Sequence, residues 1–370
     1  MKFRPRKSAS PARRADRQRS RPPAPPPSPE AAITALHQAL QTRSGLLVDS
    51  GTNCCRLFND SADGIPGLVL EKFGDVLIVQ CHEGRLSLAE ATVRNLCASA
   101  MEKIQARTVY RKLFAQERSA ALPQLEAIHQ DPTPWLGTQI EEEFPVLENG
   151  IKFLIRPYDG YSTGLFLEHR ENRQRVRGLA NGKTVLNTFA YTCAYSVAAA
   201  LGGAELVVSV DVSRKYLDWG RRNFQANALD PQPHQFIHSD IFDFLGRARR
   251  QGRRFDLVIL DPPTFGRAKR PKRVFSFVAD LDRLVGEAVE ILNPGGYALV
   301  ATNHRGTSRD RLEHAIAAVA RERGVRSMVH LRLPPDFQGD PDFAKFVLCR
   351  LAPPPVEESP NRRSTVRDPH

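Results

Sequence analysis

Residues 184–211, TVLNTFAYTCAYSVAAALGGAELVVSVD, decide the fold of this chain. A short apolar strand is followed by an alanine-rich helix, two glycines and a second apolar strand that ends in Asp211. A strand–helix–strand unit of this kind predicts two parallel strands joined by a crossover helix. The same alternation continues to residue 351. It therefore predicts an α/β fold with an open, mostly parallel sheet and helices on both faces.

The residues before this unit predict a smaller, strand-rich α+β domain with a different pattern. The expected elements are a short helix over 31–42, a small meander of strands between 46 and 81 that begins with LLV at 46–48, a helix over 86–106, a strand at 108–113, a polar stretch without regular pattern at 115–140, and a hairpin that turns at Asn149-Gly150. An Asn-Gly dipeptide tolerates the positive φ angles that such a turn requires.

Composition places these two units between two tails. We expect a disordered basic, Pro-rich tail at 1–30, the small domain at 31–156, the α/β domain at 157–351 and a disordered C-terminal tail at 352–370.

The 370 residues are 41% hydrophobic and 25% charged, which is typical of a globular protein and excludes collagen-like and fully disordered chains. No apolar run has the length that a transmembrane helix requires, and the first 30 residues contain no hydrophobic stretch typical of a secretory signal.

The net charge of +12 is concentrated in the N-terminal tail. Residues 1–29 carry nine Lys or Arg against Asp16 alone, which leaves +8 there and +4 for the rest. An electrostatic tether to nucleic acid and a solubilising tail are both open interpretations. A basic transit peptide is a third, but the many prolines would break the amphipathic helix that such a peptide needs.

The cysteines predict neither a disulfide framework nor a metal site. The chain has six of them without CxxC spacing, so we expect reduced thiols, no metal and a cytoplasmic location.

Polar residues at strand ends predict where a ligand binds, because ligands of such sheets lie at the carboxyl ends of the strands. The loop Thr188–Ala194 precedes a helix N-terminus but lacks GxGxxG, which counts against a dinucleotide enzyme. Asp211 is placed to accept hydrogen bonds from ribose hydroxyls, although Asp211 or Ser213 would also cap the next helix. Asp240 and Ile241, after the third strand, suit an adenine amino group and its ring.

The segment Asp261-Pro-Pro-Thr-Phe265 follows an apolar strand and is the most specific indication of a functional site in the sequence. Pro262 and Pro263 remove two backbone donors and fix φ, so we expect a rigid, extended turn that presents Asp261 as an acceptor and Phe265 as a stacking surface for a planar base. Five cations follow in a loop and predict contacts with RNA phosphates: Arg267, Lys269, Arg270, Lys272 and Arg273.

These motifs resemble the class I S-adenosylmethionine-dependent methyltransferases, in particular the bacterial group that modifies large-subunit ribosomal RNA. The segments that carry the resemblance are DGIPGLVLEKFGDVLIVQ (63–80), TGLFLEHRENR (163–173), VLNTFAYTCAYSVAAALGGA (185–204), VDVSRKYLDWGRRNF (210–224), DLVILDPPTF (256–265) and LNPGGYALVATNHRG (292–306). The resemblance implies a Rossmann-like seven-stranded sheet whose last strand is antiparallel, and S-adenosylmethionine as the cofactor.

The resemblance also implies roles for individual residues. The cofactor is expected to contact Arg170, Asn187, Phe189, Ala190, Tyr191, Thr192, Asp211, Val212, Asp240, Ile241 and Asp261. The catalytic set is expected to be Asp261, Pro262, Pro263 and Phe265, and His304 and Arg305 are expected to join the five cations in binding RNA. Cys193 stands where relatives usually have glycine, and Glu168 replaces a common aspartate.

The target atom follows from cysteine chemistry. Methylation of cytosine at carbon 5 needs a cysteine thiolate that adds to the ring, and neither DPPTF nor ATNHRG contains one. The ATNHRG segment is more similar to the guanine-N7 branch of the family, so we expect a guanine or another nitrogen atom in RNA. A cytosine-C5 enzyme, a non-catalytic RNA-binding or ribosome-assembly protein, and a methyltransferase that acts on proteins or small molecules are the alternatives.

Overall fold

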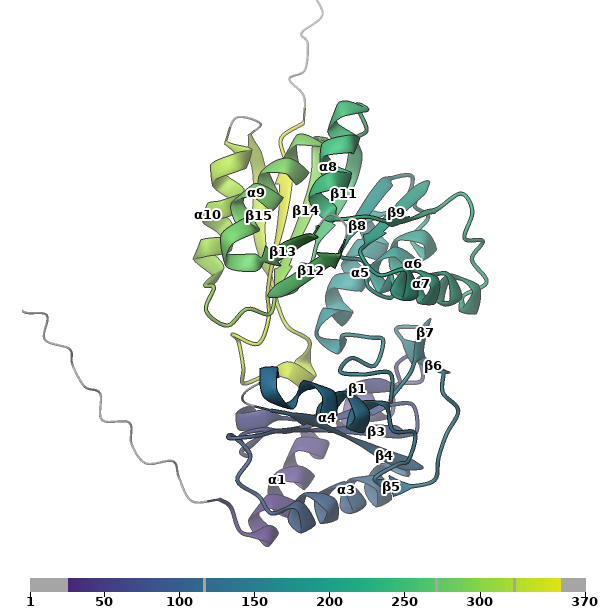
Figure 1. Cartoon of the computed structure of the whole chain (residues 1–370), viewed down its shortest axis with the longest axis vertical. Helices are drawn as coiled ribbons and strands as arrows, with labels where there is room; N and C mark the ends of the chain where they lie inside the picture. Colours follow the sequence, from purple (N-terminus) through teal and green to yellow (C-terminus); the bar gives the residue numbers. More distant parts are fainter. Residues whose placement is uncertain (1–25, 116–117, 270–271, 322–323, 354–370) are drawn as a thin grey trace, which may run out of the picture.

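The protein consists of a seven-stranded sheet stacked above a five-stranded sheet, as the computed structural model in Figure 1 shows. The structure describes residues 26–115, 118–269, 272–321 and 324–353. The expected tails at 1–30 and 352–370 fall almost entirely outside these ranges. Within them, no helix is both long and apolar enough to cross a bilayer.

The larger sheet has the strand order β10-β9-β8-β11-β14-β16-β15. Its strands are β8 (Thr184–Thr188), β9 (Leu206–Asp211), β10 (Gln235–His238), β11 (Phe255–Leu260), β14 (Leu292–Thr302), β15 (Val325–Leu331) and β16 (Lys345–Leu351). The first five run parallel, and β16 lies antiparallel between β14 and β15. This arrangement confirms the seven-stranded fold with an antiparallel last strand.

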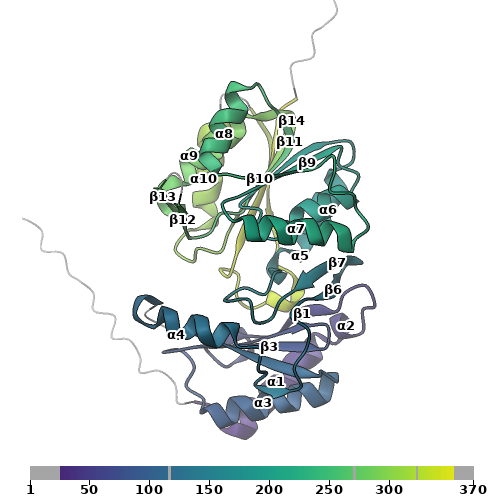
Figure 2. The same ribbon diagram turned by 45° about the vertical axis from the view of Figure 1, so that its right-hand side comes forward.

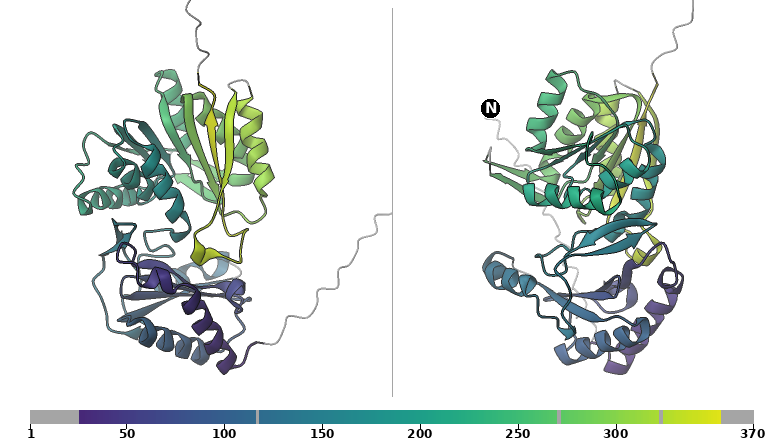
Figure 3. Two further views of the ribbon diagram at one scale, coloured as in Figure 1. Left: turned by 180° about the vertical axis from the view of Figure 1, so that it is seen from behind. Right: turned by 90° about the vertical axis from the view of Figure 1, so that its right-hand side faces the viewer.

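Helices cover both faces of this sheet, as Figures 1 and 3 show. The helices are α5 (Arg170–Leu179), α6 (Ala194–Leu201) and α7 (Arg214–Ala226) on one face, and α8 (Ile241–Arg250), α9 (Phe277–Glu290) and α10 (Arg309–Ala320) on the other. Successive strand residues alternate between two cores, because side chains along a strand point to opposite faces. Leu186 and Val258 pack with α8–α10, whereas their neighbours Val185 and Leu257 pack with α5 and α6.

The smaller sheet has the order β1-β2-β3-β4-β5. Its strands are β1 (Cys54–Asn59), β2 (Leu68–Phe73), β3 (Val76–His82), β4 (Thr108–Phe114) and β5 (Leu136–Gly137), with the 3-10 turn η1 (Asp60–Asp63) after β1. The first three strands form the expected meander. β4 pairs with β3 in parallel, because the chain crosses over through α3 (Glu90–Ile104) before it returns to the sheet.

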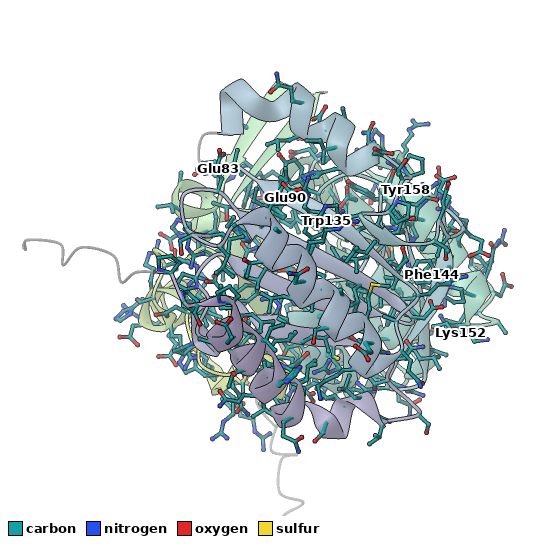
Figure 4. The ribbon with its side chains drawn as sticks, turned by 90° about the horizontal axis from the view of Figure 1, so that it is seen from below. Glu83, Glu90, Trp135, Phe144, Lys152 and Tyr158 are labelled. Carbon is teal, nitrogen blue, oxygen red and sulfur yellow. The ribbon has the colours of Figure 1, made fainter. Side chains whose placement is uncertain are left out.

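Helices cover both faces of the smaller sheet. Figures 1 and 2 show α1 (Pro29–Thr42) and α3 on its lower face and α4 (Arg118–Gln130) on the face toward the larger sheet. Figure 4 views the lower side, where Glu90 and Trp135 lie near each other. Arg111 contacts both, through an ion pair of 2.9 Å with Glu90 and a cation–π contact of 4.7 Å with the Trp135 ring.

Three sequence-based expectations are wrong. Residues 44–47 form the short helix α2 (Ser44–Leu47) rather than a strand, because four residues are too few to show a helical period. The stretch 115–140 contains α4 and β5. The expected loop after DPPTF is a hairpin of β12 (Phe265–Lys269) and β13 (Lys272–Ser276), whose alternating pattern is hidden by its many cations.

The hairpin of β6 (Phe144–Glu148) and β7 (Ile151–Ile155) lies between the two sheets and turns at Asn149-Gly150 as expected, with φ of 49° and 76° at these residues. Phe153 belongs to one buried cluster that also contains Phe73 of the smaller sheet, Phe224 of α7 and Phe337 of the 3-10 turn η3 (Pro335–Phe337). The two parts of the chain therefore share a continuous apolar core.

Candidate active site

The carboxyl ends of β8, β9, β10 and β11 meet at one edge of the larger sheet. These strands are parallel neighbours, so the loops that follow them face the same side. A pocket opens there, lined by Phe189, Val210, Asp211, Val212, Ser239, Asp240, Ile241, Pro263, Gly266 and Phe275. The structure thus brings together the sequence-predicted residues Phe189, Asp211, Val212, Asp240, Ile241 and Pro263.

The loop after β8 has an unusual backbone. Phe189, Tyr191 and Cys193 have φ of 50°, 47° and 61°, which is the left-handed region that non-glycine residues rarely adopt. Two hydrogen bonds hold this loop against β9: the Tyr191 N–H donates to Asp211 Oδ2 at 2.9 Å, and the Ala190 N–H donates to the Val210 carbonyl at 3.0 Å. The strained loop is therefore fixed in one position.

Asp211 is the centre of this arrangement. Its Oδ1 accepts the Ser213 N–H at 2.8 Å, while Ser213 itself caps α7 by accepting from Tyr216 N. Burial raises the pKa of Asp211, although the N–H donors of Tyr191 and Ser213 act in the opposite direction. An ionised carboxylate has about four acceptor positions, and the backbone N–H groups do not use all of them here, so the remainder can accept hydroxyl donors.

The far wall of the pocket is formed by the start of α8 and by the hairpin. Asp240 caps α8, with Oδ1 accepting the N–H of Phe242 at 3.0 Å. Ile241 is buried beside it, and Phe275 lies 5.1 Å from the Phe189 ring centroid. Apolar side chains between two carboxylates fit a flat heterocycle joined to a hydroxylated sugar. These residues are therefore suited to hold a nucleoside cofactor.

The remaining residues expected at the cofactor lie beneath the loop. Asn187 is buried and donates from Nδ2 to Ser196 Oγ at 2.9 Å. Thr192 is buried and donates to the Gly164 carbonyl at 2.6 Å, which ties the loop to the TGLF segment. Ala190 is buried as well. These three side chains do not line the pocket: Asn187 lies near the end of β8, and Ala190 and Thr192 lie in the loop that follows it.

Asp261 meets a partner that the sequence does not indicate. Its Oδ2 lies 3.5 Å from Nε2 of His169, in the 3-10 turn η2 (Leu167–His169), and Nδ1 of His169 lies 2.7 Å from the Tyr195 hydroxyl. Burial and the neighbouring Glu168 raise the pKa of Asp261 to about 7. Burial lowers the pKa of His169 to about 3, so this imidazole is neutral.

Two expected site residues lie elsewhere. Arg170 is fully buried and forms an ion pair with Asp336 of η3, so it does not reach the pocket. Phe265 starts the β12–β13 hairpin and is 71% exposed. Pro262 is buried next to Asp261, and Pro263 lines the pocket mouth. Phe265 is therefore available to a large ligand outside the pocket.

The residues expected to bind RNA are described only in part. The backbone of Arg267, Lys269, Lys272 and Arg273 belongs to β12 and β13, but their side chains and the whole of Arg270 lie outside the described residues. His304 is half-buried and bonds to Thr307 Oγ1 at 2.8 Å, and Arg305 is exposed and pairs with Asp340 at 2.7 Å.

The resemblance implies that Glu168, His169 and Arg170 close over the cofactor, but sequence reasoning missed Tyr195, Phe275 and the contact of His169 with Asp261. His169 lies within the FLEHR segment that the sequence singles out, but nothing in its spacing connects it to Asp261. Phe275 is found only once the hairpin is known, because the turn of β12 and β13 brings it back over Phe189.

The comparisons with known proteins agree with this geometry. The family model described as S-adenosylmethionine-dependent methyltransferase matches residues 91–349. The putative ribosomal RNA large subunit methyltransferase YwbD of Bacillus subtilis (strain 168) is 34% identical over 311 residues, which is 83% of this chain and 75% of that protein.

Other relatives match over different shares of their length. Ribosomal RNA large subunit methyltransferase I of Escherichia coli (strain SMS-3-5 / SECEC) is 32% identical over 78% of this chain and 70% of its own length. Ribosomal RNA large subunit methyltransferase K of Neisseria meningitidis serogroup B is 36% identical over 53% of this chain, and the match spans about half (54%) of that protein.

Among solved structures, a putative methyltransferase complexed with SAH superposes with a TM-score of 0.75 and 28% identity, over 87% of this chain and 81% of that chain. A putative SAM-dependent methyltransferase from Streptococcus mutans gives a TM-score of 0.73 and 27% identity over the same shares. Both likenesses extend over the two sheets.

Proposed function

Because this chain belongs to the S-adenosylmethionine-dependent methyltransferase family, we propose that it methylates a ring nitrogen of guanine in large-subunit ribosomal RNA. The resemblance expected from the motifs is thus confirmed at the level of the family, the enzyme class and the cofactor. The substrate is supported by the names of the relatives, which are ribosomal RNA large subunit methyltransferases. A ribosomal substrate also implies a cytoplasmic location.

The pocket suggests how the cofactor is held. Asp211 accepts the ribose hydroxyls, while Asp240 and Ile241 contact the adenine, with Val212 and Phe275 against the ring. The loop fixed by the Tyr191–Asp211 bond holds the methionine end near Asp261. S-adenosylmethionine supplies a methyl group on a sulfonium, and the protein chiefly has to align the acceptor and exclude water.

We choose a nitrogen atom as the methyl acceptor because of the burial and the pKa of the cysteine thiols. A cysteine that adds to a pyrimidine must be a thiolate, which requires a lowered pKa and access to the substrate. Cys193 and Cys349 are buried, and burial raises their pKa to about 12 and about 11. The other four thiols also have a raised pKa. None of the six is therefore poised as a nucleophile.

The β12–β13 hairpin is the proposed contact for the RNA. It projects from the larger sheet, as Figures 1 and 2 show, its residues Gly266 and Phe275 line the pocket, and it exposes Phe265 and Val274. The sequence adds five cations between these two residues. Aromatic surface combined with positive charge is the usual combination for single-stranded RNA.

The proposal is tested by labelling. The purified protein is incubated with methyl-labelled S-adenosylmethionine and ribosomal RNA from a strain that lacks the gene, and the RNA is digested to nucleosides. We expect labelled N7-methylguanosine. Labelled 5-methylcytidine would contradict the cysteine argument, and labelling that survives ribonuclease treatment would identify a protein or small-molecule substrate. Calorimetry without cofactor binding at millimolar concentration would instead support a non-catalytic RNA-binding role.

Two variants serve as controls for the assay. Asp261→Asn removes the carboxylate that follows β11 and should abolish most of the label. Asp282→Asn changes an exposed carboxylate on α9 that only pairs with Arg311, so its activity should equal that of the wild type.

A further inference from the structure

His169 and Asp261 come from distant parts of the chain and meet just after the carboxyl end of β11, where the chain leads on to Pro263 of the pocket lining. Asp261 follows β11, whereas His169 ends η2 and packs edge-on against the rings of Tyr195 and Phe346 at 5.5 and 5.0 Å. The Asp261 side chain keeps 26% of its surface exposed, and that of His169 keeps 7%. One side of the carboxylate therefore faces the imidazole and another side remains open to a ligand.

The hydrogen-bond directions follow from the chemistry of the three groups. A neutral imidazole has one N–H and one lone pair. The Tyr195 phenol is buried and has a pKa raised well above 10, so it keeps its proton. Among the described residues its hydroxyl bonds to Nδ1 of His169 at 2.7 Å, whereas the buried Nδ2 of the neighbouring Asn172 has no hydrogen-bond partner. Tyr195 therefore donates to Nδ1, and the Nε2–H of His169 faces Asp261.

We propose that His169 is a positioning residue, which uses its neutral Nε2–H, oriented by Tyr195, to favour the ionised form of the Asp261 carboxylate and to turn it toward the methyl-accepting base. This inference rests on the proposed function. A guanine ring becomes cationic when its ring nitrogen N7 gains a methyl group, and no proton leaves that atom. A fixed carboxylate beside the ring stabilises the positive charge as it develops.

The surroundings explain why a donor is needed. The charged groups that act on the pair are Glu168 of η2 and Arg173 of α5. The strand β16, whose Phe346 packs against His169, also carries Lys345. Arg173 is engaged in a bidentate ion pair with Glu148, and the Lys345 ammonium bonds to the carbonyls of His304 and Asp342. Within the described part of the chain, the His169 contact is thus the one polar contact present for the Asp261 carboxylate.

The test compares two variants at one position. Glutamine places an amide N–H close to the position of Nε2, whereas asparagine reaches only the position of Nδ1. His169→Gln should keep the pH profile of kcat/KM for RNA methylation close to that of the wild type. His169→Asn should lower kcat/KM about tenfold at pH 7 and move the acid limb of the profile to higher pH, because a hydrogen bond to the charged form lowers a pKa. Tyr195→Phe should give a smaller shift in the same direction.

An unchanged acid limb in His169→Asn, or equal losses in the Asn and Gln variants, would overturn the proposal. A second measurement does not depend on activity: imidazole ¹⁵N spectra of the wild type, with His169 assigned through His169→Gln. We expect a neutral ring protonated at Nε2 between pH 5 and 8. A cationic ring at pH 6, or a proton on Nδ1, would also overturn it. If these spectra are as expected while the wild type methylates no RNA, the result contradicts the proposed function. It does not contradict the proposed hydrogen bonding of His169.

Discussion

Arg170 and Asp336 form a fully buried ion pair that joins the larger sheet to the smaller one. The Asp336 carboxylate also accepts the backbone N–H of Arg56 at 2.9 Å, and the Asp336 carbonyl accepts from Arg43 at 3.0 Å. Arg43 and Arg56 belong to the first 60 residues, whereas Arg170 begins α5 directly after His169. The relative position of the two sheets is therefore fixed next to the active site.

Removing Asp336 should be severely destabilising. Asp336→Ala leaves the Arg170 guanidinium buried without its partner, which typically costs about 3–5 kcal/mol. We expect a loss of this size in the free energy of unfolding, measured with urea. Asp282→Ala breaks the exposed pair with Arg311 and should cost less than about 1 kcal/mol. Equal losses in the two variants would show that the buried pair does not hold the sheets together.

Cys193 and Gly220 predict a second stability effect. A Cβ added at Gly220 would lie 2.4 Å from Cys193 Sγ, so Gly220→Ala should cost about 1–3 kcal/mol through overpacking. Gly178→Ala is the matched control, since this helical glycine has open space and the change should be neutral or stabilising by up to about 1 kcal/mol.

The double variant Cys193→Gly/Gly220→Ala tests whether the sulfur is the cause. Glycine suits the φ of 61° at position 193 and removes the two Cys193 atoms that the new Cβ would approach to less than 3.0 Å. The two changes should therefore be non-additive, with the double variant more stable than Gly220→Ala. Additive losses in thermal unfolding would contradict this explanation.

Asp211 should control cofactor affinity. Asp211→Asn keeps the shape but loses charge-assisted bonds to hydroxyls, each worth about 1.5–3 kcal/mol, so we expect S-adenosylmethionine to bind about 10- to 100-fold more weakly by calorimetry. Because burial raises the pKa of Asp211, wild-type affinity should also fall as the pH is lowered and the carboxylate is protonated. Asp218→Asn, on the exposed side of α7, should change neither property. Unchanged affinity in Asp211→Asn would remove the ribose assignment.

The sequence predicts the larger sheet and the pocket well, because both depend on local patterns. Strand–helix alternation places Asp211, Asp240 and Asp261 at consecutive strand ends, and parallel pairing then brings them to one edge without further information. The left-handed conformation of Cys193 is one that glycine adopts without a penalty, which is consistent with the expectation that relatives have glycine at this position.

The parts that could not be predicted depend on contacts between distant segments. The pair His169–Asp261 and the burial of Arg170 against Asp336 exist because the 163–170 segment and η3 pack between the two sheets, and no spacing in the chain encodes that. In α4, only Leu125 and His129 are buried among the described side chains. With so few buried positions, the sequence of this helix shows almost no repeat of apolar residues at helical spacing.

The five cations of the hairpin should determine how RNA binding depends on salt. If Arg267, Lys269, Arg270, Lys272 and Arg273 each neutralise one phosphate of single-stranded RNA, the logarithm of affinity falls with the logarithm of salt concentration at a slope of about −3.5. Replacing all five by glutamine should flatten this slope. A variant without residues 1–28 should keep it. If the first variant keeps the slope and the second loses it, the N-terminal tail binds the RNA instead.

The pair His169–Asp261 also predicts how stability depends on pH. Asp261 has a pKa of about 7 in the folded protein and an ordinary value of 3.8, whereas His169 has about 3 and an ordinary value of 6.5. Between about pH 4 and 6.5 the folded pair therefore carries its proton on Asp261, and the unfolded chain carries one on His169. The numbers of bound protons are equal, so the wild-type pair contributes no slope in this window.

Replacing one residue of the pair at a time separates the contributions of His169 and Asp261 to the pH dependence of stability. The two variants should show slopes of stability against pH that have opposite signs. In Asp261→Asn only His169 titrates, the unfolded chain binds more protons, and stability rises with pH by up to about 1.4 kcal/mol per unit. In His169→Asn only Asp261 titrates, the folded protein binds more protons, and stability falls with rising pH at a similar rate. Urea unfolding at pH 4.5, 5.5 and 6.5, relative to the wild type, measures both. Slopes of the same sign would show that the proton does not move between these residues on unfolding.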